Sequence, residues 1–184
     1  FLLSGQGAQK PGMGAALIEQ GAPEVAETFA IASEAFGFDV ADVCLNASAE
    51  TLRDTAFAQP AMCTLSVAVA KALEVRGVRP AYVAGFSLGE YAAHVIAKTL
   101  DVQTALELVS RRGAVMAMAA DQHEGGMAAL LRCDLAQAAR LCRACAGEFG
   151  QVLAPSNVNC PGQVVISGEK EALEAACERW KGQG

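Results

Sequence analysis

The segment AYVAGFSLGEYAA, residues 81–93, decides the fold of this chain. Its first five residues are typical of a strand, and a helical pattern begins at Leu88. Between them, Gly85-Phe86-Ser87-Leu88-Gly89 matches G-x-S-x-G, in which a serine occupies a tight strand-to-helix turn and the glycines give it room. Such a turn would hold the Ser87 hydroxyl at the positive end of the helix, where backbone N–H groups can stabilise an oxyanion. The alternative is a plain turn without a catalytic role.

Apolar strands and helical stretches alternate on both sides of this segment, which predicts an α/β protein with a parallel sheet. Pro60 is expected in the first turn of a long helix, where its missing N–H costs nothing. The expected strands cover residues 1–4 and 81–85, and the expected helices cover residues 14–20, 25–36, 59–76, 88–97 and 101–119. Gly5-Gln6-Gly7 follows the first strand, where this kind of fold places a second oxyanion donor, although a glycine-rich turn can also be only a turn.

A polar segment that ends in glycine, residues 121–126, is the predicted boundary between two subdomains, residues 1–125 and 126–184. The order beyond it is strand, helix, strand, strand, helix, one strand short of the ferredoxin-like pattern. The predicted ranges are 127–133, 134–147, 152–158, 163–167 and 169–181, with Asp134 and Gln137 as a capping pair. We therefore expect the chain to begin inside a longer protein and to stop before the last strand of the second subdomain.

Composition narrows the possible functions. The chain has 184 residues, 53% of them hydrophobic, and a net charge of −6 without a basic stripe, so nucleic acid is not an expected partner. The longest uncharged stretch, residues 55–70, is interrupted by Gln59-Pro60, and no membrane span is expected. An odd number of cysteines, seven, indicates reduced thiols in a cytoplasm. Cys142 and Cys145 form a C-x-x-C pair inside a helical run with no second pair, so no metal site is expected.

An arginine lies on the apolar face of the predicted helix at residues 101–119. At about 100° per residue its apolar side chains share one broad arc, and Arg112 lies inside that arc, whereas Arg111 lies opposite, beside Glu107. A guanidinium on a core face is costly unless it finds an anion or several acceptors. It can pair with an internal carboxylate, extend to solvent at the edge of the arc, or bind a substrate carboxylate with its two-pronged donor geometry. The residues alone leave these alternatives open.

Several motifs, in order along the whole chain, resemble the malonyl-CoA:acyl-carrier-protein transacylases, the acyltransferase family of fatty acid and polyketide synthesis. They are Ser4-Gly5-Gln6-Gly7-Ala8-Gln9 with Gly12-Met13-Gly14, Gln59-Pro60-Ala61, the Gly85–Tyr91 segment, Arg112-Gly113 with Met116, and Asn157-Val158-Asn159-Cys160-Pro161-Gly162-Gln163. The resemblance implies an α/β-hydrolase-like large subdomain with an inserted ferredoxin-like small one, incomplete in this chain. It also implies transfer of malonyl from malonyl-CoA to the phosphopantetheine thiol of acyl carrier protein through a seryl ester, with no cofactor.

The resemblance also implies roles for individual residues. Ser87 matches the nucleophile, and the backbone N–H groups of Gln6 and Leu88 match the oxyanion hole. Arg112 matches the residue that binds the malonyl carboxylate. Of the three alternatives above, the resemblance therefore selects binding of a substrate carboxylate, here called the carboxylate clamp. Positions that line the substrate cleft correspond to Gln59, Asn157 and Asn159.

Two features depart from the family pattern. The residue before the serine is usually histidine, and here it is Phe86. The catalytic histidine of the family lies beyond Gly184, so residues 1–184 alone are expected to be inactive. His94 lies about 10 Å along the helix from Ser87, too far for a hydrogen bond, and His123 falls in the boundary loop, so neither is an expected base.

Three rival functions remain open. One is an acyltransferase of a polyketide pathway, and another is a serine esterase on the same turn. Arg112 argues against the esterase, because a neutral ester gives its charge no partner. The third is a non-catalytic fragment that docks on a partner, which the missing base keeps open.

Overall fold

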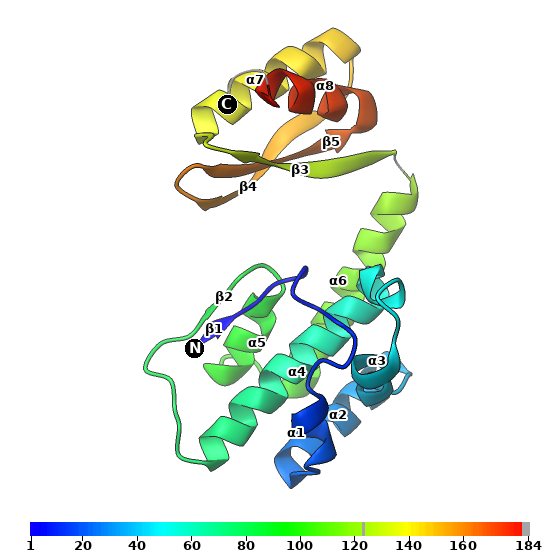
Figure 1. Ribbon diagram of the computed structural model, residues 1–184, viewed down its shortest axis with the longest axis vertical. Helices are drawn as coiled ribbons and strands as arrows, with labels where there is room; N and C mark the ends of the chain where they lie inside the picture. Colours follow the sequence, from blue (N-terminus) through cyan, green and yellow to red (C-terminus); the bar gives the residue numbers. More distant parts are fainter. Residues whose placement is uncertain (123, 182–184) are drawn as a thin grey trace. The chain divides into compact units, whose positions relative to one another are not determined.

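The computed structural model describes residues 1–122 and 124–181, and they form an α/β structure of two compact units, Phe1–Ala117 and Met118–Gly184 (Figure 1). The division between the units falls inside a long helix, α6 (Val102–Gln122). The subdomain boundary expected from the sequence, at residues 125 and 126, stays a prediction.

The first unit is a helical body around a short parallel strand pair. Strands β1 (Leu2–Leu3) and β2 (Ala84–Gly85) pair in parallel, with Leu2 opposite Ala84. The helices are α1 (Ala15–Glu19), α2 (Pro23–Phe36), α3 (Val40–Asn46), the 3-10 helix η1 (Thr51–Arg53), α4 (Thr55–Val75), α5 (Gly89–Ile96) and most of α6. Helix α4 packs against α2, α3 and α5, and its apolar face forms the centre of the core. Apart from α3 and η1, which the sequence analysis did not anticipate, these elements follow the predicted order.

Helix α4 begins earlier than predicted. Its predicted start was Gln59-Pro60, but the Asp54 side chain accepts from the backbone N–H of Ala56 at 2.8 Å and caps a helix that starts at Thr55. Pro60 therefore lies inside the helix, where its ring removes one backbone hydrogen bond. The prediction was wrong because the capping aspartate defines the start and the proline is buried in the core. As a consequence, Thr55 and Gln59 are one helical turn apart on the same face.

Within the described part of the chain, α4 is also the one helix whose length and hydropathy would suffice to cross a membrane. Of its apolar window, 61% is buried inside the first unit, and buried core helices commonly have this composition.

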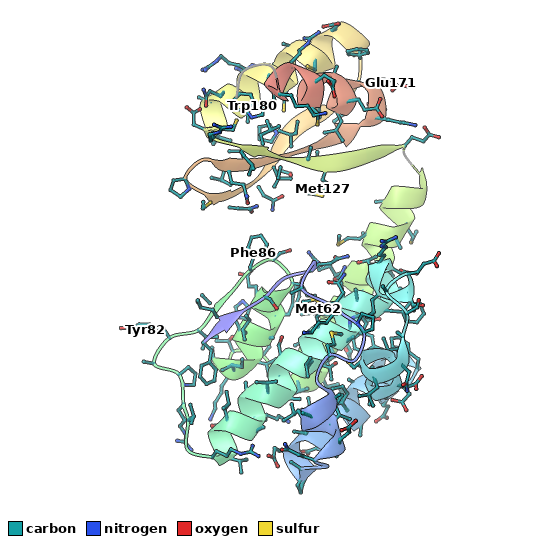
Figure 2. The ribbon with its side chains drawn as sticks, viewed as in Figure 1. Met62, Tyr82, Phe86, Met127, Glu171 and Trp180 are labelled. Atoms are coloured by element: carbon teal, nitrogen blue, oxygen red, sulfur yellow. The ribbon has the colours of Figure 1, made fainter. Side chains whose placement is uncertain are left out.

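The second unit is a three-stranded antiparallel sheet with two helices. Its elements are β3 (Gly125–Leu131), α7 (Leu135–Phe149), β4 (Leu153–Cys160), β5 (Gln163–Glu169) and α8 (Lys170–Lys181). The strand order is β3-β5-β4, and both helices lie on the same face of the sheet (Figure 1). The predicted capping pair is confirmed, because the Asp134 carboxylate accepts from the Gln137 N–H at 2.7 Å and Gln137 reciprocates. The Trp180 indole donates to the Leu131 carbonyl at 3.0 Å and ties α8 to the end of β3 (Figure 2).

The C-x-x-C pair belongs to the core of this second unit. Cys142 and Cys145 are buried in α7 and pack with Leu130, Val164 and Ile166. Burial raises the pKa of the Cys142 thiol to about 11, which keeps it protonated and unreactive at neutral pH. No cluster of three metal-ligating side chains occurs among the residues described.

Candidate functional site

Ser87 occupies the turn between β2 and α5 in a conformation that few residues other than glycine adopt. Its φ is 51°, and its side chain is exposed to solvent. A non-glycine residue in this region stores strain that the surrounding structure must maintain, and such residues cluster at functional sites. The sequence-based prediction of a strand-to-helix turn at this serine is thereby confirmed in backbone geometry.

The glycines on either side of Ser87 are required by close packing. A Cβ atom on Gly85 would lie 2.2 Å from the carbonyl of Gly89, and one on Gly89 would lie 2.5 Å from the carbonyl oxygen of Leu3. Both neighbours are backbone atoms, which cannot rotate away. The G-x-S-x-G spacing thus lets α5 start directly against the two strands and keeps Ser87 at their end.

The two loops that carry the predicted oxyanion donors follow the carboxyl ends of the two parallel strands, β1 and β2. The Phe86 N–H donates to the Leu3 carbonyl at 3.0 Å, and a Cβ on Gly5 would lie 2.5 Å from the Phe86 carbonyl oxygen, so the loops touch. Gln6 follows Gly5, and Leu88 precedes α5 at the positive end of its dipole. Among the hydrogen bonds of residues 1–122 and 124–181, neither the Gln6 nor the Leu88 backbone N–H has an acceptor. Both N–H groups are thus without a backbone or side-chain acceptor on the two loops that meet at Ser87, and an oxyanion hole needs donors of this kind.

The first of these loops is anchored to the helical body. Gln9 accepts from the Gly7 N–H at 2.7 Å and donates to the Leu52 carbonyl at 2.9 Å. This bridge fixes the loop that carries Gln6. In the second loop, Phe86 is 52% exposed (Figure 2), and one edge of its ring lies against Gly5, where an added Cβ would meet it at 2.9 Å.

Arg112 reaches Ser87 from helix α6. Its Nη2 donates to the Ser87 Oγ at 3.3 Å, and its Nη1 donates to the Gln59 Oε1 at 2.5 Å. Arg112 is half-buried, whereas Arg111 is exposed, as the apolar arc of the helix predicted. Among the side chains that the structure describes, which do not include those of residues 120–123 and 182–184, no carboxylate lies within 4.0 Å of the guanidinium. Its positive charge therefore has only neutral acceptors, and it remains available to an anion beside the serine.

Gln59 is fully buried and links Arg112 to two further side chains. Its amide nitrogen donates to the Thr55 hydroxyl and, at 3.4 Å, to the Met116 Sδ. No role was predicted from the sequence for Thr55, and Met116 was predicted only as part of a family motif. The Asp54-Thr55 start of α4 was the signal that could have revealed Thr55, because it puts a hydroxyl one turn before Gln59.

His94 is not positioned as a base for Ser87. The Nδ1 of His94 lies 2.7 Å from the Thr99 hydroxyl, and its Nε2 lies 4.0 Å from a Glu90 carboxylate oxygen. Both ring nitrogens of His94, which lies in the last turn of α5, therefore have polar neighbours, as expected for a helix histidine. His123 lies outside the described residues.

Asn157 and Asn159 belong to strand β4 of the second unit. Asn157 is exposed and accepts from the Ser156 hydroxyl at 2.9 Å, and Asn159 donates to the Gln163 side chain at 2.9 Å. Shifts in the β4–β5 register interrupt the strand around both residues. At such register shifts the side chains of a strand no longer alternate regularly between the two faces of the sheet. β-Bulges near functional sites often redirect a side chain in this way.

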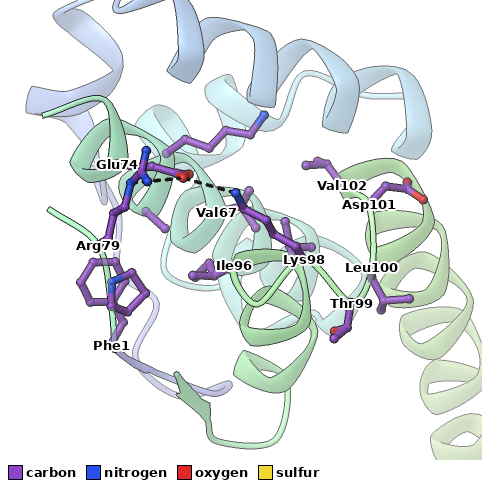
Figure 3. A pocket seen from close by; sticks show the side chains of 14 residues that line it. Phe1, Val67, Glu74, Arg79, Ile96, Lys98, Thr99, Leu100, Asp101 and Val102 are labelled. Carbon is purple, nitrogen blue, oxygen red and sulfur yellow. Dashed lines mark ion pairs between the residues drawn. The ribbon is translucent and has the colours of Figure 1, made fainter. Parts of the chain in front are cut away.

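A separate cavity of about 600 Å³ opens at the other end of α5. Glu74 forms ion pairs there with Arg79 at 3.9 Å and with Lys98 at 3.6 Å (Figure 3). Neither Ser87 nor Arg112 lines this cavity. The hydroxyl, the unpaired donors and the cation gather instead at the β2–α5 turn, which we take as the candidate site.

Comparisons with known proteins identify the family of the chain. Residues 1–184 match the family described as "Acyl transferase domain". The chain is 43% identical over 187 residues to the malonyl CoA-acyl carrier protein transacylase of Salmonella typhimurium, and 40% identical over 184 residues to that of Bacillus subtilis. All of this chain is covered in both cases, with 59% and 57% of those relatives.

Solved structures are similar as well. A malonyl CoA-acyl carrier protein transacylase from Coxiella burnetii superposes with a TM-score of 0.90 at 40% identity, covering 100% of this chain and 58% of that one. A second structure, a type II PKS acyl-carrier protein in complex with its malonyl-transacylase, gives a TM-score of 0.88 at 39% identity, with 100% and 59% covered. The chain thus spans less than two thirds of the length of these relatives.

Proposed function

The chain belongs to the acyl transferase domain family, and we propose that the full-length protein transfers malonyl from malonyl-CoA to the phosphopantetheine thiol of an acyl carrier protein. The observation that carries the proposal is the contact of Arg112 with Ser87, which brings a cation with only neutral partners to a strained serine. A malonyl ester on Ser87 has a free carboxylate a few bonds from Oγ, and this carboxylate is the anion that Arg112 lacks.

The proposed reaction has two halves. In the first, the Ser87 Oγ attacks the thioester carbonyl, loses its proton to a base, and the carbon–sulfur bond breaks to release coenzyme A as a thiol. In the second, the carrier-protein thiol attacks the seryl ester, and Ser87 recovers its proton. In both halves the tetrahedral oxyanion would lie against the backbone N–H groups of Gln6 and Leu88, which would stabilise its developing charge.

The proton acceptor in this proposal is the histidine that the family resemblance assigns beyond Gly184. General-base help is typically worth about 10²–10⁴ in rate, so residues 1–184 alone should transfer malonyl very slowly. No bound cofactor is required, because the thioester supplies the activated acyl group.

The finer architecture is part of the same proposal. We take residues 1–125 as an α/β-hydrolase-like subdomain that bears the nucleophile, and residues 126–184 as part of an inserted ferredoxin-like one. The antiparallel order β3-β5-β4, with two helices on one face, supports the second assignment. Asn157 and Asn159 are proposed as polar residues of the substrate cleft. A cytoplasmic location is proposed because all seven cysteines are free thiols.

A polyketide pathway is a second candidate for the source of the carrier protein. It is favoured by one observation, the similarity to the malonyl-transacylase that was solved with a type II PKS acyl-carrier protein. The chemistry at Ser87 would be the same in both pathways. A serine esterase is less compatible, because a neutral ester would leave the Arg112 charge without an anionic partner.

Transfer and hydrolysis are separated by one assay. The full-length protein is incubated with malonyl-CoA and the phosphopantetheine form of an acyl carrier protein, and the products are resolved by mass spectrometry. We expect malonyl on the carrier thiol and little free malonate. Malonate released at the same rate with or without carrier protein would make the enzyme a hydrolase, and no turnover at all would favour a non-catalytic role.

A further inference from the structure

We infer that Met116 is a positioning residue for Arg112. It acts by fixing the orientation of the Gln59 side-chain amide, with the oxygen toward Arg112 and the nitrogen toward Met116. The inference rests on the proposed function, since it assigns Arg112 the task of holding a substrate carboxylate. The feature behind it is a chain of contacts that runs from Met116 through Gln59 to Arg112 and ends at the Ser87 hydroxyl.

Both ends of the Gln59 amide have partners inside the protein. Its side chain is fully buried, its amide nitrogen has the Thr55 hydroxyl and the Met116 sulfur as acceptors, and its oxygen accepts from Arg112. A primary amide carries two N–H donors, so both are used. Gln59 therefore acts on the reaction through Arg112 and does not contact the acyl group.

The orientation of a buried amide is decided by neighbours that can play only one role. A guanidinium only donates hydrogen bonds, and a thioether sulfur only accepts them, whereas a threonine hydroxyl can do either. Arg112 requires the amide oxygen on its side, and Met116 requires the amide nitrogen on the other. The flipped amide would point its N–H groups at the guanidinium and its oxygen at the sulfur. Thr55 tolerates both orientations, so Met116 opposes the flip from the nitrogen side of the amide, as Arg112 does from the oxygen side.

The positions of the four residues explain how the chain of contacts is built. Thr55 and Gln59 are one turn apart on α4, and Arg112 and Met116 are one turn apart on α6, so each pair shares a helix face. The Gln59 oxygen holds the Nη1 side of the guanidinium, which leaves the Nη2 side directed at Ser87. Because the guanidinium is planar, fixing one side also fixes the direction in which the other can bind a carboxylate.

The test compares malonyl and acetyl transfer by the full-length protein, because acetyl has no distal carboxylate for Arg112. Met116→Leu keeps the volume and removes the sulfur acceptor. We expect it to lower malonyl transfer roughly three- to fivefold more than acetyl transfer, the size of one neutral hydrogen bond. Gln59→Leu should lower the malonyl-to-acetyl ratio roughly tenfold, since a hydrogen bond to a charged group is lost. Gln103→Leu, the same change at an exposed site on α6, is the matched control and should leave the ratio unchanged.

The decisive measurement is the double variant Gln59→Leu/Met116→Leu. If Met116 acts through Gln59, the double variant has the same ratio as Gln59→Leu alone. Ratios that multiply would overturn the inference and make Met116 a direct substrate contact. A Met116→Leu ratio equal to wild type would overturn it too. That variant changes a side chain that is 40% exposed, so it should fold even if Gln59→Leu does not accumulate.

Arg112→Ala, measured in parallel, separates this inference from the proposed function. If Arg112→Ala keeps the malonyl preference, the carboxylate clamp itself is wrong and the inference falls with it. If Arg112→Ala loses the preference while both Gln59→Leu and Met116→Leu retain it, only the inference is wrong.

Discussion

The Nη2 atom of Arg112 lies 3.3 Å from the Oγ of Ser87, although 25 residues separate them in the sequence. The strand-to-helix turn sets the position of the serine, and the third turn of α6 sets that of the arginine. The contact gives the site a nucleophile and a recognition group within reach of one small acyl chain. The account of substrate choice depends on this pair.

Substitution of Arg112 should change selectivity more than overall reactivity. Arg112→Ala removes a charge-assisted pair worth about 2–3 kcal/mol, so malonyl transfer should fall roughly 30- to 150-fold relative to acetyl transfer. Arg112→Lys should restore only part of the difference, because an ammonium cannot form two parallel hydrogen bonds. Steady-state rates with malonyl-CoA and acetyl-CoA measure the ratio. Equal losses for both substrates, together with a lower melting temperature, would indicate a structural role for Arg112 instead.

The sequence predicted the parts of the site that local rules govern. Ser87 was identified because G-x-S-x-G between a strand and a helix constrains the backbone through nearest neighbours. Arg112 was identified because helical periodicity alone shows which residues lie on the apolar face. Both arguments need only a few consecutive residues.

The parts that were missed depend on packing between elements distant in the sequence. The start of α4 was misplaced because a proline usually marks a first turn, whereas here the Asp54 cap fixes the helix end and Pro60 is buried against the core. The interaction of Gln59 with Met116 spans 57 residues, and periodicity on one helix carries no information about the partner on another. Helix α3 is short, and it is stabilised by packing against α2 and α4.

The glycine before the nucleophile should tolerate no side chain. In Gly85→Ala the new Cβ would meet backbone atoms at 2.2 Å, so β2 and α5 would have to separate. We expect the free energy of unfolding to fall by more than about 3 kcal/mol, measured by urea denaturation. Gly147→Ala is the matched control, because no atom lies within 4 Å of its Cβ and it is exposed in α7. The free energy of unfolding of Gly147→Ala should rise by about 0.5–1 kcal/mol. A Gly85→Ala protein as stable as wild type would contradict the close packing at this turn.

Acid should weaken the start of helix α6 through its capping residue. Hydrogen bonds from the backbone N–H and the hydroxyl of Thr104 lower the pKa of Asp101 below its ordinary value of 3.8. A carboxyl with a lowered pKa stabilises the folded state above its ordinary pKa, and this contribution disappears as the pH falls through the lowered value. Asp101→Asn keeps an uncharged capping oxygen, so its stability should depend less on pH.

The comparison is made with urea midpoints of wild type and Asp101→Asn from about pH 6 to about pH 3. We expect the advantage of wild type to shrink across this interval. A difference between the two proteins that stays constant with pH would show that the Asp101 charge is not what stabilises the helix start.

The seryl ester is the central claim, and intact-mass analysis tests it most directly. Full-length wild type and Ser87→Ala are each incubated with malonyl-CoA without carrier protein, and peptide mapping locates any adduct. The account predicts one malonyl group on wild type, bound to Ser87, its loss on addition of the carrier-protein thiol, and no adduct on Ser87→Ala. A malonyl adduct that persists on Ser87→Ala, or rapid transfer to the carrier protein by that variant, would contradict it.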